Sequence, residues 1–257
     1  MNDKALKLND RQRDMLELLE RTGEIRVPDL KTRFEVTEMT IRRDLEKLEQ
    51  TGRVKRTFGG AIMVTGDIAL SERAGVFSEE KARIGRRAAS CIHPGDSVFI
   101  DGGTTTLQLV RNLEQNLRIT VVTNAINLAA ELMDKNIPTL VTGGMLMEKT
   151  STLIGPVCAE TLSKMAFDRV FLGATGISAR HGFSNSNMYE AEIKRIAISR
   201  AKEVNIVADR SKWGVQDLFS FAGLSEAHRW VTDSMPEQEE DVRQVLREAS
   251  VECVICD

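Results

Sequence analysis

The stretch Thr37–Ala61, TEMTIRRDLEKLEQTGRVKRTFGGA, decides how the rest of this chain is interpreted. Ile41, Leu45 and Leu48 recur at helical spacing and predict a helix with one apolar stripe. Gly52 is expected to end this helix, and the basic residues after it alternate with apolar ones, as in a strand. A cationic helix followed by a cationic hairpin suits the major groove and the phosphates of duplex DNA.

The residues before this stretch complete a small helical module. Asn9 followed by Gln12 has the spacing of a capping box, and Pro28 suits the first turn of another helix. In chain order we expect a helix over 10–21, a short strand at 25–27, helices over 28–34 and 38–50, and a basic two-stranded hairpin of 53–57 with 61–64. This order predicts a winged helix-turn-helix domain.

In such a domain the third helix enters the major groove by its amino-terminal end. Arginine can bond to guanine or phosphate, and threonine hydroxyls suit phosphate. The candidate DNA-binding residues are Thr37, Glu38, Thr40, Arg42, Arg43, Lys47, Arg53, Lys55 and Arg56. Which of Arg42 and Arg43 reads a base stays open. In the alternative interpretation, both arginines pair with Glu38, Asp44 or Glu46 on an exposed helix.

Charge is distributed unevenly along the 257 residues, whose net charge is −3. Residues 1–60 hold 14 Lys and Arg against 12 Asp and Glu, and the remainder holds 21 against 26. The positive charge is therefore local, as expected of a DNA-binding surface, although a solvated charged face is the common alternative. Because the sequence lacks a membrane-length apolar run and a signal-peptide core, it predicts a cytoplasmic protein that does not bind a membrane.

From residue 97 onward, short β-rich runs alternate with helical stretches. Runs are expected near 97–100, 119–122, 138–141, 169–172, 204–207 and 229–231, with a terminal strand near 251–255. The predicted fold class is α/β, with an N-terminal winged helix-turn-helix domain and a larger, mostly parallel α/β sheet domain. The expected boundaries are 1–64 for the first domain, 65–78 for a linker and 79–257 for the second domain.

Polar and glycine-rich residues follow these predicted strands, at the edge where open α/β sheets bind ligands. The turn at 101–106, DGGTTT, is the best phosphate candidate, Asn124 could bond a sugar hydroxyl, and Lys212 could neutralise an anion. The candidate effector-binding residues are Asp101, Gly102, Gly103, Thr104, Thr105, Thr106, Asn124, Gly143, Gly144, Gly173, Glu190, Lys194, Asp209 and Lys212. The alternatives are ordinary tight turns and, for Glu190 with Lys194, a surface i,i+4 pair.

Four cysteines do not suggest a disulfide framework in a chain of this length. Cys253 and Cys256 form a C-x-x-C, but they lie in the predicted terminal strand and no second cysteine pair accompanies them. We therefore predict neither a metal site nor a cofactor.

The chain resembles the DeoR family of bacterial transcriptional regulators. The resemblance rests on TIRRDL at 40–45 and GGA at 59–61, and continues through DGGTTT at 101–106, FLGATGI at 171–177, EAEIKR at 190–195 and ADRSK at 208–212. Thr37 stands where the family commonly has serine, and either residue can cap a helix. The resemblance implies a sugar-phosphate-sensing domain with the ribose-5-phosphate isomerase fold, a double-stranded DNA operator as partner, and a homo-oligomer, either dimer or tetramer.

The favoured hypothesis is a non-enzymatic repressor of a carbohydrate-utilisation operon, released from its operator by a phosphorylated sugar. A sugar-phosphate isomerase is the alternative, since Asp101, Glu190 or Asp209 could act as a carboxylate base. An isomerase, however, would have no use for the basic N-terminal module. An RNA-binding regulator ranks last, because the module has only two aromatic residues, Phe34 and Phe58, and no stacking platform.

Overall fold

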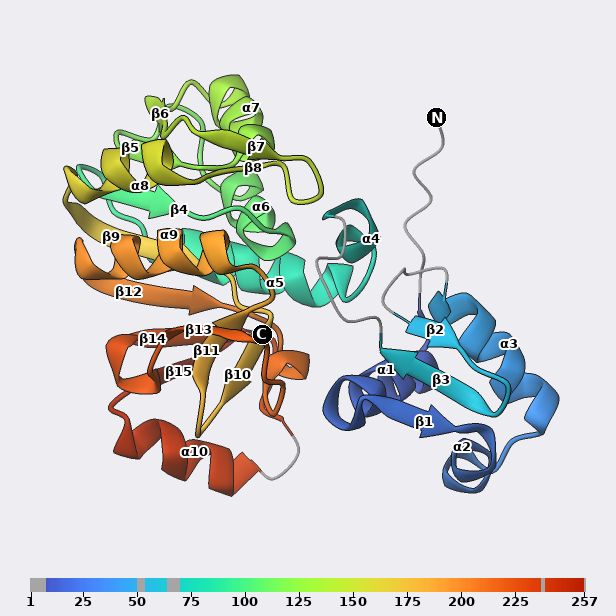
Figure 1. The fold of residues 1–257 in the computed structure, drawn as a ribbon. Helices are drawn as coiled ribbons and strands as arrows, with labels where there is room; N and C mark the ends of the chain where they lie inside the picture. The colour runs from blue at the N-terminus through green and yellow to red at the C-terminus, as the bar shows by residue number, and fades with distance from the viewer. Residues whose placement is uncertain (1–7, 50–53, 64–69, 237–238, 257) are drawn as a thin grey trace. The chain divides into compact units, whose positions relative to one another are not determined.

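The computed structural model describes residues 8–49, 54–63, 70–236 and 239–256. The chain divides into two compact units, residues 1–78 and 79–257 (Figure 1), and each is considered by itself. None of the helices in the described ranges has the length and the hydropathy that crossing a membrane requires.

The first unit has the helices expected from the sequence. Helix α1 covers Asp10–Thr22 and starts with the predicted capping box, in which the side chains of Asn9 and Gln12 each bond the other's backbone N–H. Gly23 ends this helix in the left-handed conformation. Helix α2 covers Val27–Phe34 and α3 covers Glu38–Glu49. The predicted last residue of the third helix, Gln50, lies outside the described residues.

The sheet of this unit has three strands, because the short strand expected at 25–27 pairs with the predicted two-stranded hairpin. The strands are β1 at Glu24–Arg26, β2 at Val54–Arg56 and β3 at Gly60–Met63, in the antiparallel order β1-β3-β2. Strand β1 can join because Gly60 allows a close approach. A Cβ atom at Gly60 would lie 1.9 Å from the carbonyl oxygen of Ile25.

The core of the first unit contains Ile41, Leu45 and Leu48, as their helical spacing predicted. It also contains Val76 and Phe77, which come from the segment predicted to be a linker. Within that segment, residues 65–69 lie outside the described ranges, and helix α4 covers Leu70–Ala74. Burial of two large side chains makes the end of this segment part of the first unit's packing.

Asp44 is buried on α3, contrary to the alternative in which it would pair with Arg42 or Arg43 on an exposed face. Its carboxylate accepts a hydrogen bond from Nε of Arg11 and one from Nε2 of Gln12, both at 2.7 Å. A buried carboxylate requires such partners. These contacts tie α3 to the start of α1.

The second unit is built on a seven-stranded, entirely parallel sheet, as its alternating pattern predicted. The strand order is β15-β14-β12-β9-β4-β5-β6. The strands are β4 at Ser97–Ile100, β5 at Thr120–Thr123, β6 at Thr139–Val141, β9 at Phe167–Leu172, β12 at Ala201–Val207, β14 at Arg229–Thr232 and β15 at Glu252–Ile255.

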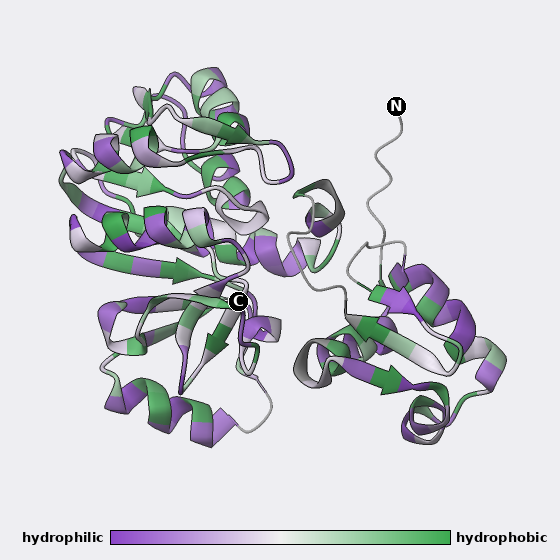
Figure 2. Cartoon of the chain, viewed as in Figure 1, coloured by the Kyte–Doolittle hydropathy of each residue, from purple (hydrophilic) through white to green (hydrophobic). Residues whose placement is uncertain are grey.

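Helices cover both faces of this sheet, so its strands contribute apolar residues to both cores, while charged residues lie near the amino ends of several strands (Figure 2). One face packs on helices α5, α6 and α7, through residues such as Val98, Ile100 and Val121. The other packs on α8, α9 and α10, through residues such as Phe99 and Trp230. The helices are α5 at Ser78–Ala89, α6 at Thr104–Arg111, α7 at Ile126–Asp134, α8 at Pro156–Ser163, α9 at Met188–Ser199 and α10 at Glu239–Glu248.

Two antiparallel elements and helix α10 were not predicted. A hairpin joins β7 (Met145–Met147) to β8 (Thr152–Ile154), and a small sheet has the order β10-β11-β13. The strands of the small sheet are β10 at Gly176–Ser178, β11 at Gly182–Asn185 and β13 at Phe219–Ala222. Two short 3₁₀ turns, at Arg210–Lys212 and Leu224–Glu226, precede and follow β13.

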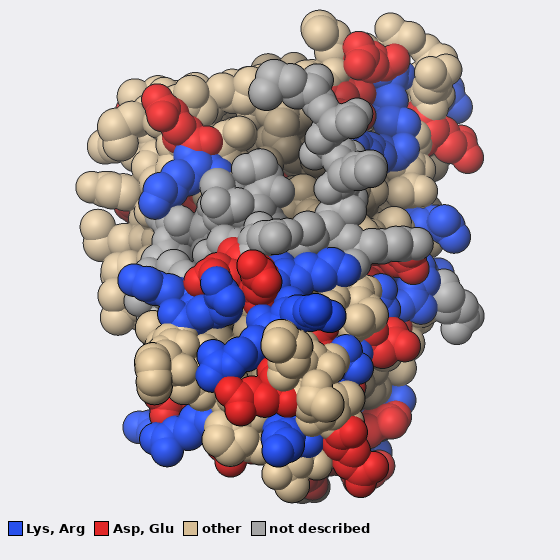
Figure 3. Space-filling model, turned by 90° about the vertical axis from the view of Figure 1, so that its right-hand side faces the viewer, with Lys and Arg blue, Asp and Glu red and all other residues tan. Residues whose placement is uncertain are grey.

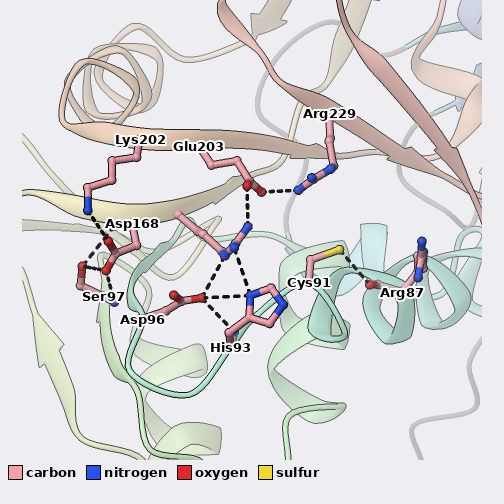
Figure 4. A network of polar contacts seen from close by, with 10 residues as sticks. Arg87, Cys91, His93, Asp96, Ser97, Asp168, Lys202, Glu203 and Arg229 are labelled. Carbon is pink, nitrogen blue, oxygen red and sulfur yellow. Dashed lines mark hydrogen bonds and ion pairs between the residues drawn. The ribbon is translucent and has the colours of Figure 1, made fainter.

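Polar side chains form a network at the amino ends of the parallel strands (Figure 4). Asp168 accepts a hydrogen bond from Lys202 at 2.8 Å, and from the backbone N–H and hydroxyl of Ser97 at 2.9 and 2.8 Å. Beside them, Arg169 pairs with Glu203 at 2.5 Å. The hydrogen bond from Lys202 contributes most to lowering the pKa of Asp168, and the two from Ser97 add to it.

Asp168→Asn should make folding less sensitive to acid. Because the pKa of Asp168 lies below its ordinary value of about 3.9, its ionised form stabilises the fold at neutral pH. That contribution, about 1 kcal/mol for a partly exposed group, is lost as the pH falls from about 4 towards the lowered pKa. Urea unfolding between pH 3 and pH 7 measures the effect. The exposed Asp134, changed to Asn, is the control, and equal acid sensitivity in wild type and Asp168→Asn would contradict the assignment.

Candidate functional site

The start of α3 is organised by two of the predicted DNA-binding threonines. The hydroxyl of Thr37 accepts a hydrogen bond from the backbone N–H of Thr40 at 3.3 Å, which caps the helix as predicted. The two hydroxyls also bond each other at 2.9 Å. Both side chains are thus held in place at the helix end that would face a groove.

The basic residues of α3 differ in their surroundings. The guanidinium of Arg42 pairs with Glu38, and its Nε lies 2.8 Å from the carboxylate oxygen. Arg42 thus forms the ion pair on an exposed helix that the alternative interpretation describes. Arg43 is also exposed, and within the described ranges no ion pair is recorded for it. Lys47 is half-buried on the same helix. Arg43 is therefore the arginine better placed to reach a new partner.

In the wing, Lys55 is exposed, whereas Arg56 is paired. Glu49 of α3 accepts hydrogen bonds from the backbone N–H of Arg56 at 2.9 Å and from its Nε at 2.7 Å. These bonds lower the pKa of Glu49, the one from the backbone most strongly. The third predicted wing residue, Arg53, lies outside the described residues. The Glu49 contact fixes the wing against α3.

A surface hollow of about 550 Å³ lies among β1, the starts of α2 and α3, and the turn between β2 and β3. Arg26 and Lys31 line it together with Arg42, and Phe58 at the wing tip is fully exposed. Figure 3 shows basic and acidic side chains interspersed over one face of the molecule. Arg26 and Lys31 were not predicted site residues, because they precede the stretch of concentrated positive charge.

In the second unit, the candidate ligand residues lie at the carboxyl ends of the strands, and the turn after β4 fits closely between its neighbours. A Cβ at Gly102 would lie 2.2 Å from Cγ2 of Thr152, so only glycine fits there. The backbone N–H of Gly102 donates to the side chain of Asn124 at 3.3 Å. The amide of Asn124 donates in turn to the carbonyl of Leu153, also at 3.3 Å. Asn124, predicted to bond a ligand, thus also holds the turn.

A buried ion pair lies at the centre of this edge. Nζ of Lys194 donates to the carboxylate of Asp101 at 2.6 Å and to the carbonyl of Gly173 at 2.7 Å, and it lies 5.2 Å from the centre of the Phe221 ring. Burial raises the pKa of Asp101, with Lys194 opposing the rise and Glu190 adding to it. Three predicted site residues therefore meet here, each from a different part of the fold: Asp101, Gly173 and Lys194.

Glu190 is also buried, so the alternative of an exposed Glu190–Lys194 pair on α9 is wrong. Its carboxylate accepts hydrogen bonds from Asn185 at 2.7 Å and from the hydroxyl of Thr152 at 3.1 Å. Neither Asn185 nor Thr152 was a predicted site residue. The sequence signal for them is weak, because both lie on short antiparallel strands that the alternating pattern did not reveal.

Helix α6 begins at Thr104, directly after the turn that follows β4. In the described structure no side chain caps its amino terminus at Gly103, and the hydroxyl of Thr106 donates to the carbonyl of Gly103 at 3.1 Å. Thr104, Thr105 and Thr106 are buried. An uncapped helix amino terminus next to backbone N–H groups suits an anion.

The turn after β6 contacts the start of α8. Gly143 and Gly144 have positive φ angles of 75° and 122°. A Cβ at Gly144 would lie 2.6 Å from the carbonyl oxygen of Ile154. Next to them, the thiol of Cys158 donates to Thr142 at 3.2 Å, and burial raises the pKa of that thiol.

Asp209 and Lys212 form a second group, at the ends of β12 and β14. Asp209 accepts hydrogen bonds from the backbone N–H and hydroxyl of Ser211, and Nζ of Lys212 donates to that hydroxyl at 3.1 Å. The neighbouring Asp233 accepts from the backbone N–H of Arg210 at 2.8 Å, and burial, with Asp209, raises its pKa.

Comparison with known proteins identifies the family. The model of the DeoR-like helix-turn-helix domain matches residues 11–66, and that of the DeoR C terminal sensor domain matches residues 76–234. The chain is 37% identical over 228 residues to the HTH-type transcriptional repressor GlcR of Bacillus subtilis, covering 87% of this chain and 88% of that protein. It is 29% identical over 254 residues to the glycerol-3-phosphate regulon repressor of Escherichia coli, covering 98% and 100%.

Among solved structures, ribose 5-phosphate isomerase A of Methanocaldococcus jannaschii is similar with a TM-score of 0.41 and 16% identity, over 53% of this chain and 55% of that chain. Family membership rests on the sequence matches, which span both units. The chain belongs to the DeoR family of helix-turn-helix transcriptional regulators, which are not enzymes.

Proposed function

We propose that this protein is a cytoplasmic repressor of a carbohydrate-utilisation operon, released from its operator by a phosphorylated sugar. Three parts of this proposal are inferences for this chain: repression, the class of effector, and binding as a dimer or tetramer. The observation that carries the proposal is the buried Asp101–Lys194 pair beside an uncapped helix amino terminus.

The geometry of the sheet edge supports a phosphorylated sugar as ligand. The amino terminus of α6 offers backbone N–H groups and the positive end of a helix dipole to a phosphate. Carboxylates and amides nearby, those of Asp101, Asn124 and Glu190, suit the hydroxyls of a sugar. The names of two relatives point the same way, since one is a repressor called GlcR and the other represses a glycerol-3-phosphate regulon.

The first unit supports operator recognition by α3 and the wing. Helix α3 has 12 residues, so it is about 18 Å long and can occupy the major groove over one half-site. Two half-sites require two copies of the chain. Effector binding would then shift the population towards an arrangement in which the DNA-binding units are poorly spaced.

Arg43→Ala should weaken operator binding by about 1–3 kcal/mol, because Arg43 is exposed and can bond a base edge or a phosphate. Arg42→Ala should have a smaller effect, since Arg42 already pairs with Glu38. A binding sequence is first selected from a random DNA library, and fluorescence anisotropy then gives the affinity at several salt concentrations. The control is Arg247→Ala, which removes an exposed positive charge from α10 in the second unit. Unchanged binding by Arg43→Ala would rule out Arg43 as a DNA contact of α3.

A phosphorylated sugar should raise the melting temperature, because a ligand at 100 times its Kd stabilises the folded state by about 2.7 kcal/mol. The screen compares pentose and hexose phosphates with the unphosphorylated sugars. Lys212→Ala should reduce the shift if this lysine neutralises the phosphate, while DNA binding stays intact. Lys202→Ala, at the opposite end of the strands, is the matched control. If Lys212→Ala keeps the full shift, Lys212 does not belong to the site.

A further inference from the structure

Exposed hydrophobic side chains are concentrated in one part of the second unit. Of the fourteen large hydrophobic side chains that are exposed in the described ranges, seven fall between residues 126 and 157. These seven are Ile126, Met133, Leu140, Val141, Met145, Leu146 and Val157. A concentration of this kind marks an interaction surface rather than ordinary surface scatter.

The centre of this surface is β6, an edge strand of the seven-stranded sheet. Leu140 and Val141 are 52% and 47% exposed, although consecutive residues of a strand point to opposite faces. Within the described structure, strand β6 pairs with β5 alone. Its outer edge therefore offers both backbone hydrogen-bonding groups and apolar side chains, as a strand that pairs with another chain does.

The opposite edge of the same sheet is protected. Strand β15 carries Glu252, which pairs with Arg229 at 2.6 Å, and α10 packs beside β15. Ile255 is its only exposed large hydrophobic residue in the described structure, at 39%. Charge and a covering helix are the usual means of blocking edge-to-edge pairing, and β6 lacks the charge.

The surface around β6 continues into β7 and the start of α8. A Cβ at Gly143 would lie 3.7 Å from Cγ1 of Val157, so the turn after β6 touches α8. Met145 on β7 is 62% exposed. We name the edge made by β6, β7 and the start of α8 the β6 edge.

We infer that the β6 edge is where a second copy of this chain docks, about a two-fold axis. Residues 136–147, NIPTLVTGGMLM, contain no charged residue, in a chain where 28% of the residues are charged. In a two-fold contact each surface patch meets its own copy, so a charged patch would repel itself and a neutral apolar patch does not. Residues 136–147 thus offer no charged side chain to a partner bound by charge.

The proposed function supplies the reason for choosing a second copy as the partner, and this inference rests on it. Each chain has one recognition helix, and two operator half-sites require two. The β6 edge also contains the turn Thr142–Gly144, whose glycines are candidate effector residues. A ligand that moves this turn would therefore act directly on the contact between copies, which is how it would change the spacing of the DNA-binding units.

The test measures mass in solution, without DNA or sugar phosphate. An oligomer whose mass is unchanged in a folded Val141→Lys variant would overturn this inference alone, whereas a monomeric wild type would also count against the proposed binding as a dimer or tetramer. Sedimentation velocity on the full 28.6 kDa chain should give a dimer or larger assembly. Val141→Lys should raise the dissociation constant at least about tenfold and lower the mass by half or more, because two ammonium groups would face each other across the axis. Met145→Lys should act likewise. Ile255→Lys, on the opposite edge, should keep the wild-type mass. Circular dichroism and a melting curve check that each variant is folded.

Cross-linking gives an independent readout. Leu140→Cys, under mild oxidation, should form a disulfide-linked dimer that wild type treated in the same way does not form, because residues near a two-fold axis meet their own copies. A monomeric wild type at tens of micromolar, or a folded Val141→Lys variant with unchanged mass, would overturn the inference. Failure of Leu140→Cys to cross-link while wild type remains a dimer would also overturn it.

Discussion

The second unit depends on one buried ion pair. Lys194, from α9, reaches the end of the parallel sheet, where it bonds both the carboxylate of Asp101 after β4 and the carbonyl of Gly173 after β9. Isolated buried charges are costly, so each of these groups requires the others. The pair thereby fixes how α9 crosses the strand ends and gives the edge a preformed set of charges and polar groups.

Much of the fold could be predicted from the sequence, because the relevant signals are local. The stripe of Ile41, Leu45 and Leu48 identified α3, and Asn9 with Gln12 identified the start of α1. The short apolar runs followed by polar residues identified six strands of the parallel sheet and the edge at which those residues gather. Parallel strands put their carboxyl ends at the same edge of a sheet, so the position of the polar residues could be predicted from the order of the strands and helices alone.

The partners of the buried polar groups could not be predicted, because they are far apart in the sequence. Spacing suggested that Glu190 and Lys194 pair on one helix, yet Glu190 bonds Thr152 and Asn185, and Lys194 bonds Asp101, 93 residues away. The antiparallel strands that carry Thr152 and Asn185 are only three and four residues long. Runs this short show little periodicity, so the sequence did not predict Thr152 and Asn185 as residues of the site.

The side chain of Gln12 has two structural tasks. Its oxygen accepts from the backbone N–H of Asn9, which caps α1, and its nitrogen donates to buried Asp44 on α3. The orientation of α3 is thus encoded partly at the first turn of another helix. A chimaera that transplants α3 alone into a related scaffold would inherit the outward-facing residues but not the angle at which they are presented, unless Arg11 and Gln12 were carried with it.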